Sequence, residues 1–476
     1  MSDIMKSIPF GQLTEWILNE YKKTGQVFGI QKAYVADQSK TIEIFGRKLE
    51  NPVGPAAGPH TQLAQNLVAA YVAGARFFEL KTVQKMDGPE LSACIPKPCI
   101  VAEDEAYNCE WSTELYVPQA MAEYIKGWIL IHVIAKEFGL GSPDGFQFNM
   151  SCGYNLEGIK DKKIDDFIEG LKDAGDTAIF KECKQWLLEH ISLFEHVTKE
   201  DIEAVPAEIC NSITLSTMHG CPPQEIENIV TYLLKEKHIN TYVKCNPTLL
   251  GYEFVRKAMD DLGYDYMAFT DFHFKDDLQY EDAVPMLKRL LETASQEGLS
   301  FGVKLTNTFP VDIKRQELPG EEMYMSGKAL FPLSISVASR LAESFDGKLP
   351  MSFSGGADQK NIDQIVGCGI WPVTVATVLL KPGGYKWLTR IAEKADTCEI
   401  GKCGEVQVET LKKLAEDSLT DAHYQKTVKK AAAKQTEEKS PLLDCLKKKD
   451  APKVKEFTRH KRVCGNCADV CPNRAN

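Results

Sequence analysis

Long hydrophobic runs are missing from the sequence, since none approaches the roughly 18 residues that a membrane-spanning helix requires. The amino-terminal segment, Met1 to Ile30, mixes charged and apolar residues and contains no signal-peptide core. The chain has 476 residues, of which 43% are hydrophobic and 26% charged, and is long enough to bury a sizeable core. We therefore expect a soluble, cytoplasmic protein.

Excess positive charge is also missing, because the sequence has 56 basic and 67 acidic residues and a formal net charge of −11. Nucleic-acid binding usually requires a basic face, so no nucleic-acid partner is expected. One basic stretch, Lys426 to Arg462, is the exception. The sequence has no strand followed by GxGxxG and no repeat of solenoid-like period, so it carries no recognisable dinucleotide-binding domain and is not a repeat protein.

Cysteine is in modest excess, with 15 residues in the chain. Most of them stand alone in apolar or strand-like contexts and are expected to be reduced core thiols, because a cytoplasmic protein rarely forms disulfides. Two places stand out from this background. One is Cys152, and the other is a group near the carboxyl end made of Cys464, Cys467 and Cys471.

From Asn51 onward, short β-branched runs alternate with helical stretches, a pattern typical of βα units around a parallel sheet. We expect strands at 52–57, 76–81, 107–111, 146–151, 241–246, 301–308, 350–354 and 372–376. Eight such units predict an α/β fold of the (β/α)8 TIM-barrel type. A ninth candidate strand, Ser212 to Thr217, lies in the stretch 157–240, which we interpret as a long insertion between the fourth and fifth strands.

Three regions are expected along the chain. Residues 1–45 form an amino-terminal helical extension, in which Pro9 to Thr24 has apolar residues at helical spacing. Residues 46–425 form the barrel. Residues 426–476 form a Lys-rich linker that ends in a cysteine-containing tail.

The carboxyl ends of barrel strands normally hold the functional residues, and here they are unusually polar. Glycines at the ends of the seventh and eighth strands, such as Gly355 and Gly356, allow backbone N–H groups to approach a phosphate. Lys81 and Lys244 supply positive charge in the barrel mouth. Asparagine side chains in the same set can meet both the N–H and the C=O of a ring amide. The pattern fits a flat, anionic cofactor and an amide-bearing substrate.

Nine short strings in chain order carry a more specific resemblance. They are NPVGPAAGP, FFELKTV, NCEWSTE, FNMSCGYN, VKCNPT, GVKLTNT, MSGKALFPLS, SFSGGAD and VTVATVLLKPGGY. These strings resemble successive elements of the dihydroorotate dehydrogenase and dihydropyrimidine dehydrogenase family of FMN barrels. More narrowly, the chain is similar to the selenate reductase subunit branch of large iron–sulfur flavoproteins, whose label is itself a guess at activity. The resemblance covers residues 1 to about 425.

The resemblance implies a role for each matching position. The residues that would hold FMN are Ala57, Gly58, Lys81, Thr82, Lys244, Asn307, Gly355, Gly356, Ala376 and Thr377. The residues that would face the substrate are Asn108, Asn149, Asn307 and Thr308. Cys152 would be the proton donor or acceptor, although Gly153 stands where the family usually has proline. The implied activity is FMN-dependent reduction or oxidation of a C=C bond in a cyclic amide, such as a pyrimidine, a purine or a dihydroorotate-like heterocycle.

The tail from Cys464 to Pro472 has the C-x2-C-x3-C-P ending of a bacterial ferredoxin run. Lys461 occupies the position of the first expected cysteine, so a [4Fe-4S] cluster would need a fourth ligand. Cys398, Cys403, Cys445 or a partner chain could supply it. A degenerate motif that binds nothing fits the sequence equally well. The resemblance further implies a partner subunit with iron–sulfur and FAD modules that oxidises NAD(P)H, and it leaves a homo-oligomer open.

Two other functions remain open at this point. One is a barrel aldolase that uses Lys81, Lys244 or Lys304 as a Schiff base. The other is a non-catalytic electron-transfer subunit of a larger iron–sulfur flavoenzyme.

Two further motifs are polar enough to suggest a site. We interpret the pair His219 and Cys221 as part of a turn and not a metal site, because no second His/Cys pair lies nearby in the sequence. Glu321 and Glu322 are interpreted as solvated charge.

Overall fold

Eight parallel strands form a barrel in this computed structural model, which describes residues 5–102, 105–109, 112–216 and 219–427. The barrel strands are β3 (Val53–Pro55), β4 (Phe77–Glu79), β7 (Gln147–Cys152), β8 (Ser212–Leu215), β9 (Asn240–Cys245), β10 (Phe301–Leu305), β13 (Met351–Phe353) and β14 (Val373–Val375). Their order is β3-β14-β13-β10-β9-β8-β7-β4. The Arg76 N–H donates to the Val53 oxygen at 2.9 Å and joins the two ends of the sheet. The predicted TIM-barrel fold is therefore confirmed.

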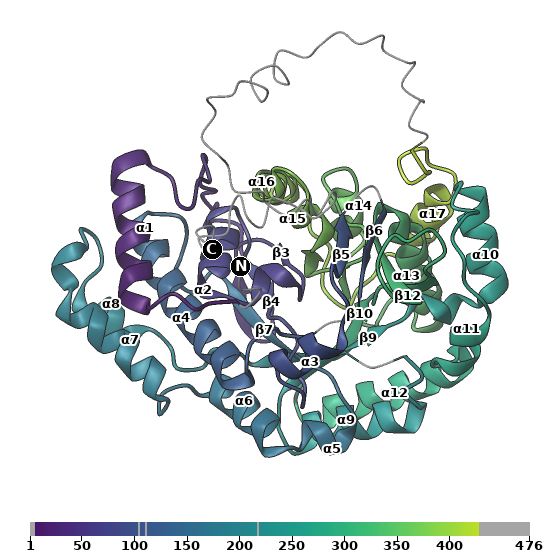
Figure 1. Cartoon of the computed structure of the whole chain (residues 1–476), viewed down its shortest axis with the longest axis horizontal. Helices are drawn as coiled ribbons and strands as arrows, with labels where there is room; N and C mark the ends of the chain where they lie inside the picture. Colours follow the sequence, from purple (N-terminus) through teal and green to yellow (C-terminus); the bar gives the residue numbers. More distant parts are fainter. Residues whose placement is uncertain (1–4, 103–104, 110–111, 217–218, 428–476) are drawn as a thin grey trace, which may run out of the picture.

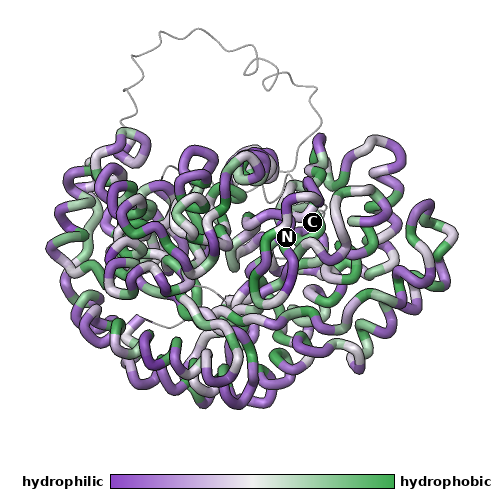
Figure 2. Tube along the Cα trace, turned by 180° about the vertical axis from the view of Figure 1, so that it is seen from behind, coloured by the Kyte–Doolittle hydropathy of each residue, from purple (hydrophilic) through white to green (hydrophobic). Residues whose placement is uncertain are grey.

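Helices surround these strands as a ring (Figure 1). The main ones are α2 (Ala64–Val72), α4 (Val117–Glu137), α6 (Lys162–Lys172), α7 (Ala178–Glu189), α9 (Pro223–Lys235), α10 (Tyr252–Asp261), α12 (Tyr280–Gln296), α13 (Phe331–Ser344), α14 (Ile362–Gly367), α16 (Gly384–Ala395) and α17 (Val408–Ser418). Shorter helices are α3 (Gly88–Cys94), α5 (Leu156–Ile159), α8 (Lys199–Ala204), α11 (Phe272–Asp276) and α15 (Thr377–Leu380). Along the outer helices hydrophilic and hydrophobic residues alternate (Figure 2), because each helix buries one face against the barrel.

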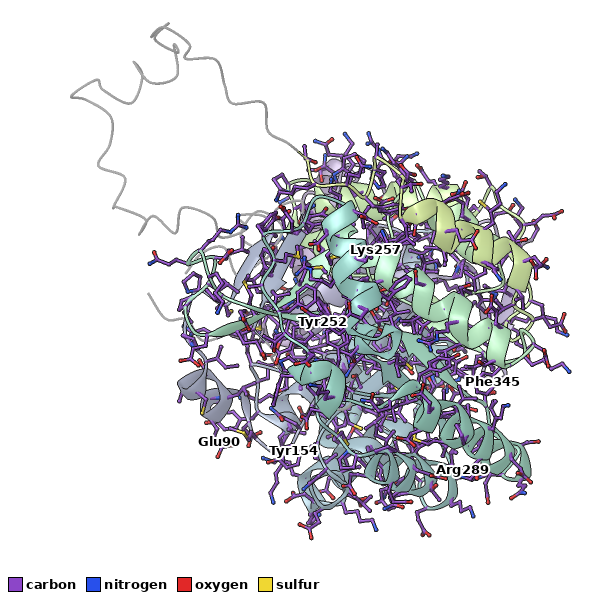
Figure 3. All side chains as sticks on the ribbon, turned by 90° about the vertical axis from the view of Figure 1, so that its right-hand side faces the viewer. Glu90, Tyr154, Tyr252, Lys257, Arg289 and Phe345 are labelled. Atoms are coloured by element: carbon purple, nitrogen blue, oxygen red, sulfur yellow. The ribbon has the colours of Figure 1, made fainter. Side chains whose placement is uncertain are left out.

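The helix α9 illustrates this amphipathic pattern. It buries Ile226, Ile229, Val230 and Leu233, which recur at helical spacing on one face. The outward faces of the ring carry charge, such as Arg289 of α12, which is labelled in Figure 3. Among the described residues, no helix is long and apolar enough to cross a membrane.

The third barrel strand differs from the one expected. The run at 107–111 was predicted to be that strand, but its first two residues belong to β6 (Glu105–Asn108), which is part of a separate antiparallel sheet. The ninth candidate instead forms β8, which is fully buried and pairs with β7 and β9 as the fourth barrel strand. Both runs are short, and periodicity does not reveal which neighbour a strand pairs with. The predicted insertion over 157–240 is therefore wrong as well, because that stretch contains a barrel strand.

The real insertions follow β4 and β10 and join into one four-stranded antiparallel sheet. Its order is β11-β12-β6-β5, where β11 is Phe309–Asp312, β12 is Glu322–Gly327 and β5 is Ile100–Ala102. Pairing of β6 with β12 places Asn108 opposite Tyr324, although more than 200 residues separate them in the sequence. This sheet brings two distant loops to the same end of the barrel.

The predicted amino-terminal helix is α1 (Phe10–Thr24), and it packs on the outer helices. Phe10 meets Trp186 of α7 edge-on at 5.9 Å between ring centroids, and Tyr21 stacks on Phe138 at 3.7 Å. A two-stranded hairpin of β1 (Ile42–Ile44) and β2 (Arg47–Leu49) follows. Its carbonyl groups accept hydrogen bonds from Gln147 at the start of β7, so the hairpin lies at the amino end of the barrel, away from the strand ends.

Replacing Gly54 with alanine should separate β3 from β4, because the added Cβ would lie 1.6 Å from the Phe77 carbonyl oxygen. We expect the free energy of unfolding, measured by urea denaturation, to fall by about 3 kcal/mol or more. Gly367→Ala is the matched control, since a Cβ there meets nothing within 4 Å and should leave stability unchanged or slightly higher. A Gly54→Ala variant as stable as the parent would contradict the closed barrel.

Candidate functional site

A cavity of about 630 Å³ lies at the carboxyl ends of the barrel strands. Its wall is formed by residues at or just after the carboxyl ends of all eight barrel strands, together with residues of the antiparallel sheet. Tyr154, which follows β7 and is labelled in Figure 3, belongs to this wall. The volume is in the range of cofactor and small-molecule sites, roughly 300–1,000 Å³.

Twelve of the predicted site residues lie together in the cavity wall. They are Ala57, Gly58, Lys81, Thr82, Asn108, Lys244, Asn307, Thr308, Gly355, Gly356, Ala376 and Thr377. They come from seven different strands or loops that are spread along the sequence. Their convergence at one mouth follows from the parallel barrel, in which all strand ends face the same way.

Two consecutive glycines after β13 form a part of the wall that a side chain could not occupy. Gly355 has φ +113° and Gly356 has φ +84°, a backbone region that favours glycine. A Cβ on Gly355 would lie 2.3 Å from the Ser334 Oγ, and a Cβ on Gly356 would lie 2.7 Å from the Gly327 oxygen. The wall is therefore bare backbone at this point, which allows close approach of a ligand.

A buried ion pair crosses the barrel interior next to the cavity. The Lys304 Nζ on β10 lies 2.7 Å from the Glu79 Oε1 on β4, and both side chains are at most 2% exposed. Lys304 also donates to Thr374 at 2.6 Å and to Ser352 at 3.0 Å. Thr374 in turn donates to the second Glu79 oxygen at 3.1 Å. The network joins β4, β10, β13 and β14.

Lysine side chains surround the carboxylate of this network. Burial lowers the pKa of Lys304 to about 8, although the Glu79 carboxylate opposes this shift. Burial alone would raise the pKa of Glu79, but the charges of Lys304 and Lys244 outweigh it and hold that pKa below its usual value. The Glu79 carboxylate therefore faces the Lys304 and Lys244 side chains, and Lys81 lines the same wall.

An amide of the cavity wall is oriented by a chain of hydrogen bonds. The Asn307 Nδ2 donates to the Asn246 oxygen at 2.7 Å, and the Asn246 Nδ2 donates to Asp277 at 3.0 Å. Asp277 also accepts from Thr248 at 2.7 Å and from the Gly220 N–H at 2.9 Å. Asn307 is thus held in one orientation from outside the cavity. Asp277 was missed in the sequence because it follows the short helix α11 and no strand.

His219 belongs to the same network. Its Nδ1 lies 2.9 Å from Asp277, and its ring stacks on Tyr324 at 5.6 Å between centroids. Burial alone would raise the pKa of Asp277, but the hydrogen bond and charge of His219 contribute to holding it below its usual value.

The interpretation of Glu322 as solvated charge was wrong, because Glu322 pairs with His273 at 2.5 Å and accepts a hydrogen bond from the Tyr324 hydroxyl at 2.8 Å. No group of three or more His, Cys, Asp or Glu residues in the described part of the chain could hold a metal ion.

Among the residues predicted to bind the cofactor or substrate or to transfer a proton, two do not line the cavity, Cys152 and Asn149. Cys152 ends β7 with 0% exposure, and burial raises the pKa of its thiol to about 12. Side chains alternate along a strand, so Cys152 shares a face with the core residue Met150. Asn149 donates to the Thr214 Oγ1 at 2.8 Å inside the barrel. The catalytic role of Cys152 and the substrate role of Asn149 stay predictions.

The predicted cluster ligands Cys464, Cys467, Cys471 and Cys445 lie outside the described residues. The other two candidates are described and bond within the barrel domain. The Cys398 thiol donates to the Lys394 oxygen at 3.1 Å, and the Cys403 sulfur lies 3.7 Å from the Trp371 oxygen. The cluster therefore also stays a prediction.

A family model described as "Oxidoreductase YgfK, N-terminal TIM-barrel domain" matches residues 28–426. The chain belongs to this family. Two curated relatives called "Putative oxidoreductase YgfK", from Escherichia coli K12 and Escherichia coli O157:H7, are each 47% identical to it over 459 residues. The match covers 94% of this chain but 44% of each YgfK relative, so the chain spans less than half of their length.

The solved structures with a similar arrangement include two of DHODH from Eimeria tenella. The complex with ferulenol is 16% identical, with a TM-score of 0.47, and covers 87% of this chain and 94% of that one. The ligand-free form is 14% identical, with a TM-score of 0.43, and the match covers 84% of this chain and 99% of that one.

Replacing Lys304 with methionine should leave the Glu79 carboxylate buried without its main partner. We expect the free energy of unfolding to fall by about 3–5 kcal/mol, and the double variant Glu79→Gln/Lys304→Met to recover part of that loss. Lys402→Met is the matched control, because Lys402 pairs with Glu405 in solvent, where such pairs contribute about 1 kcal/mol or less. A Lys304→Met variant that loses no more than this control would show that the pair does not stabilise the barrel.

Proposed function

We propose that the chain is the FMN-binding catalytic barrel of an oxidoreductase that adds hydrogen to, or removes it from, a C=C bond in a cyclic amide. The observation that supports this most directly is the composition of the cavity. A bare glycine wall, several lysines and a row of amide and hydroxyl side chains line one space of about 630 Å³. The family's own description as an oxidoreductase agrees with this proposal.

The residues present fit FMN. Gly355 and Gly356 would hold the phosphate, because a Cβ at either position would collide with neighbouring atoms and only bare backbone can approach there. Ala57 and Gly58 would lie under the ring, and Lys81 and Lys244 would face its polar edge. The lysine-rich floor suits a ring that carries negative charge when reduced. When bound, the flavin would supply the hydride chemistry of the site.

The side chains of the chain itself would bind and orient the substrate. Asn108, Asn307 and Thr308 offer donors and acceptors for the N–H and C=O groups of a ring amide. A ligand that leaves one such buried group unmatched would lose roughly 1–3 kcal/mol of binding. Because Asn246 and Asp277 fix the orientation of Asn307, the site would select ligands by the order of their donors and acceptors.

The Schiff-base alternative has one observation in its favour, the lowered pKa of Lys304. Lys304 is 0% exposed and bonded to Glu79 and Thr374, so a carbonyl substrate does not reach it without opening the barrel. Borohydride trapping with a carbonyl substrate tests this alternative, and trapped protein would support it against the flavin proposal.

The partner and the narrower family branch are also proposals. Because the chain spans 44% of each YgfK relative, we propose that electrons are exchanged with an iron–sulfur and FAD module outside the barrel. The cysteines Cys464, Cys467 and Cys471 would bind a [4Fe-4S] cluster at that junction, with a fourth ligand from elsewhere. The selenate reductase subunit branch is named by neither the family model nor the relatives.

Replacing Gly356 with alanine should weaken FMN binding at least tenfold. The added Cβ would push against the Gly327 carbonyl and displace the backbone that we propose to bind the phosphate. Quenching of flavin fluorescence on titration of the flavin-free protein measures this affinity. Gly404→Ala is the matched control, since it has a similar φ of +78° but lies away from the cavity wall. Equal FMN affinities in the two variants, or no FMN binding by the parent protein, would contradict the proposal.

Replacing Cys152 with alanine should slow turnover of the heterocycle while leaving the flavin spectrum intact, if its thiol transfers the proton. The thiol does not line the cavity, but the next two residues, Gly153 and Tyr154, do. Proton transfer by Cys152 therefore requires this segment to rearrange when the substrate binds. Full activity in Cys152→Ala would remove the role and would leave the rest of the proposal in place.

A further inference from the structure

Two cysteines face each other in the wall of the cavity. Cys99 precedes β5 and Cys109 follows β6, and both line the cavity. The antiparallel register pairs Ile100 with Asn108, so the next pair outward is Cys99 and Cys109. The Cys109 N–H donates to the Cys99 oxygen at 2.9 Å, which shows that the ladder continues to this pair.

This register gives a backbone spacing at which a disulfide can form. Directly opposed residues of a hydrogen-bonded antiparallel pair have Cα atoms about 5.5 Å apart. Disulfides form at Cα separations of about 4.4–6.8 Å, and opposed side chains lie on the same face of the sheet. Both cysteines are free thiols and are partly exposed, so a small reagent can reach them.

The surroundings of the two thiols raise the pKa of both. Burial raises the pKa of the Cys99 thiol, and negative charge on Glu114 and on Cys109 raises it further. Burial raises the pKa of Cys109 as well. Mildly alkaline conditions therefore favour the thiolate that disulfide exchange requires.

We propose that Cys99 and Cys109 are a redox-active dithiol, which closes to a disulfide across β5 and β6 by reaction with a small-molecule disulfide. The thiolate of one cysteine attacks the reagent and releases one thiolate, which takes up a proton. The second cysteine then attacks the mixed disulfide and releases the other half of the reagent as a thiol. Overall, two protein thiols are oxidised to one disulfide and one reagent disulfide is reduced to two thiols.

The disulfide would act on the cavity through its neighbours. Cys109 directly follows Asn108, whose side chain we propose to meet the substrate, and Asn108 pairs with Ile100 and Tyr324 on its two sides. A covalent link at the next position would hold β5 against β6 and restrict the motion of Asn108. The redox state of the dithiol would thus set the shape of one side of the cavity. The formation of the disulfide itself does not depend on the proposed FMN function.

The test uses the full chain, incubated anaerobically with glutathione disulfide in mildly alkaline buffer and then digested for peptide mass spectrometry. We expect a peptide that links Cys99 to Cys109, with the loss of two thiols per chain and their return on treatment with dithiothreitol. Cys99→Ser and Cys109→Ser should each lose this peptide and carry glutathione on the remaining cysteine. The control Cys94→Ser removes an exposed cysteine of α3 and should keep the linked peptide.

The inference is overturned if Cys94 replaces either cysteine in the linked peptide, or if glutathione adducts accumulate on both Cys99 and Cys109 without a link. Flavin binding is measured separately on the same samples. A protein that binds FMN but forms no Cys99–Cys109 link contradicts this inference alone. A protein that forms the link but binds no FMN contradicts the proposed function alone.

Discussion

A buried pair of opposite charges sets the conditions for the rest of the site. The Glu79 carboxylate and the Lys304 ammonium meet inside the barrel, from strands that are not neighbours in the sheet. Charges removed from water are costly unless they are paired and hydrogen-bonded, and here Thr374 bonds to both partners. Four strands are therefore held in one relative arrangement at the level where the cavity begins.

Lysines lie around this pair in the cavity wall. Lys244 helps to hold the pKa of Glu79 below its usual value, and Lys81 and Lys244 both line the cavity. The bare backbone of Gly355 and Gly356 and the oriented amide of Asn307 belong to the same wall. A phosphate-bearing, electron-rich ring satisfies the first two features, and a cyclic amide satisfies the third. The proposed function connects these separate observations by a single physical requirement, the binding of an anionic cofactor next to a polar heterocycle.

The sequence predicted the barrel and twelve residues of the cavity wall because strand ends can be recognised locally. Lys81 and Asn307 lie at the ends of runs that were predicted as strands, and Gly355 directly follows such a run. The pairing of strands was harder to predict. The run that contributes to β6 was assigned to the barrel, whereas the run that forms β8 was not. Features that depend on pairing across the fold, such as the dithiol of Cys99 and Cys109, were missed for the same reason.

The direction in which a side chain points was also difficult to predict from the sequence. Cys152 was expected at a strand end that faces the cavity, but β7 includes this residue and turns its side chain into the core. Asp277 acts on Asn307 only through Asn246, and this indirect contact leaves no signal in the spacing of the sequence. Residues that line a barrel mouth are thus easier to predict than the residues that orient them.

The most direct test of the central claim is a spectrum of the anaerobically purified protein, reconstituted with FMN, reduced with dithionite and then mixed with pyrimidine or purine heterocycles. The account predicts that the protein binds one flavin and that at least one cyclic amide with a C=C bond restores the oxidised flavin spectrum. A protein that binds no flavin, or whose reduced flavin is reoxidised by none of these heterocycles, would contradict it.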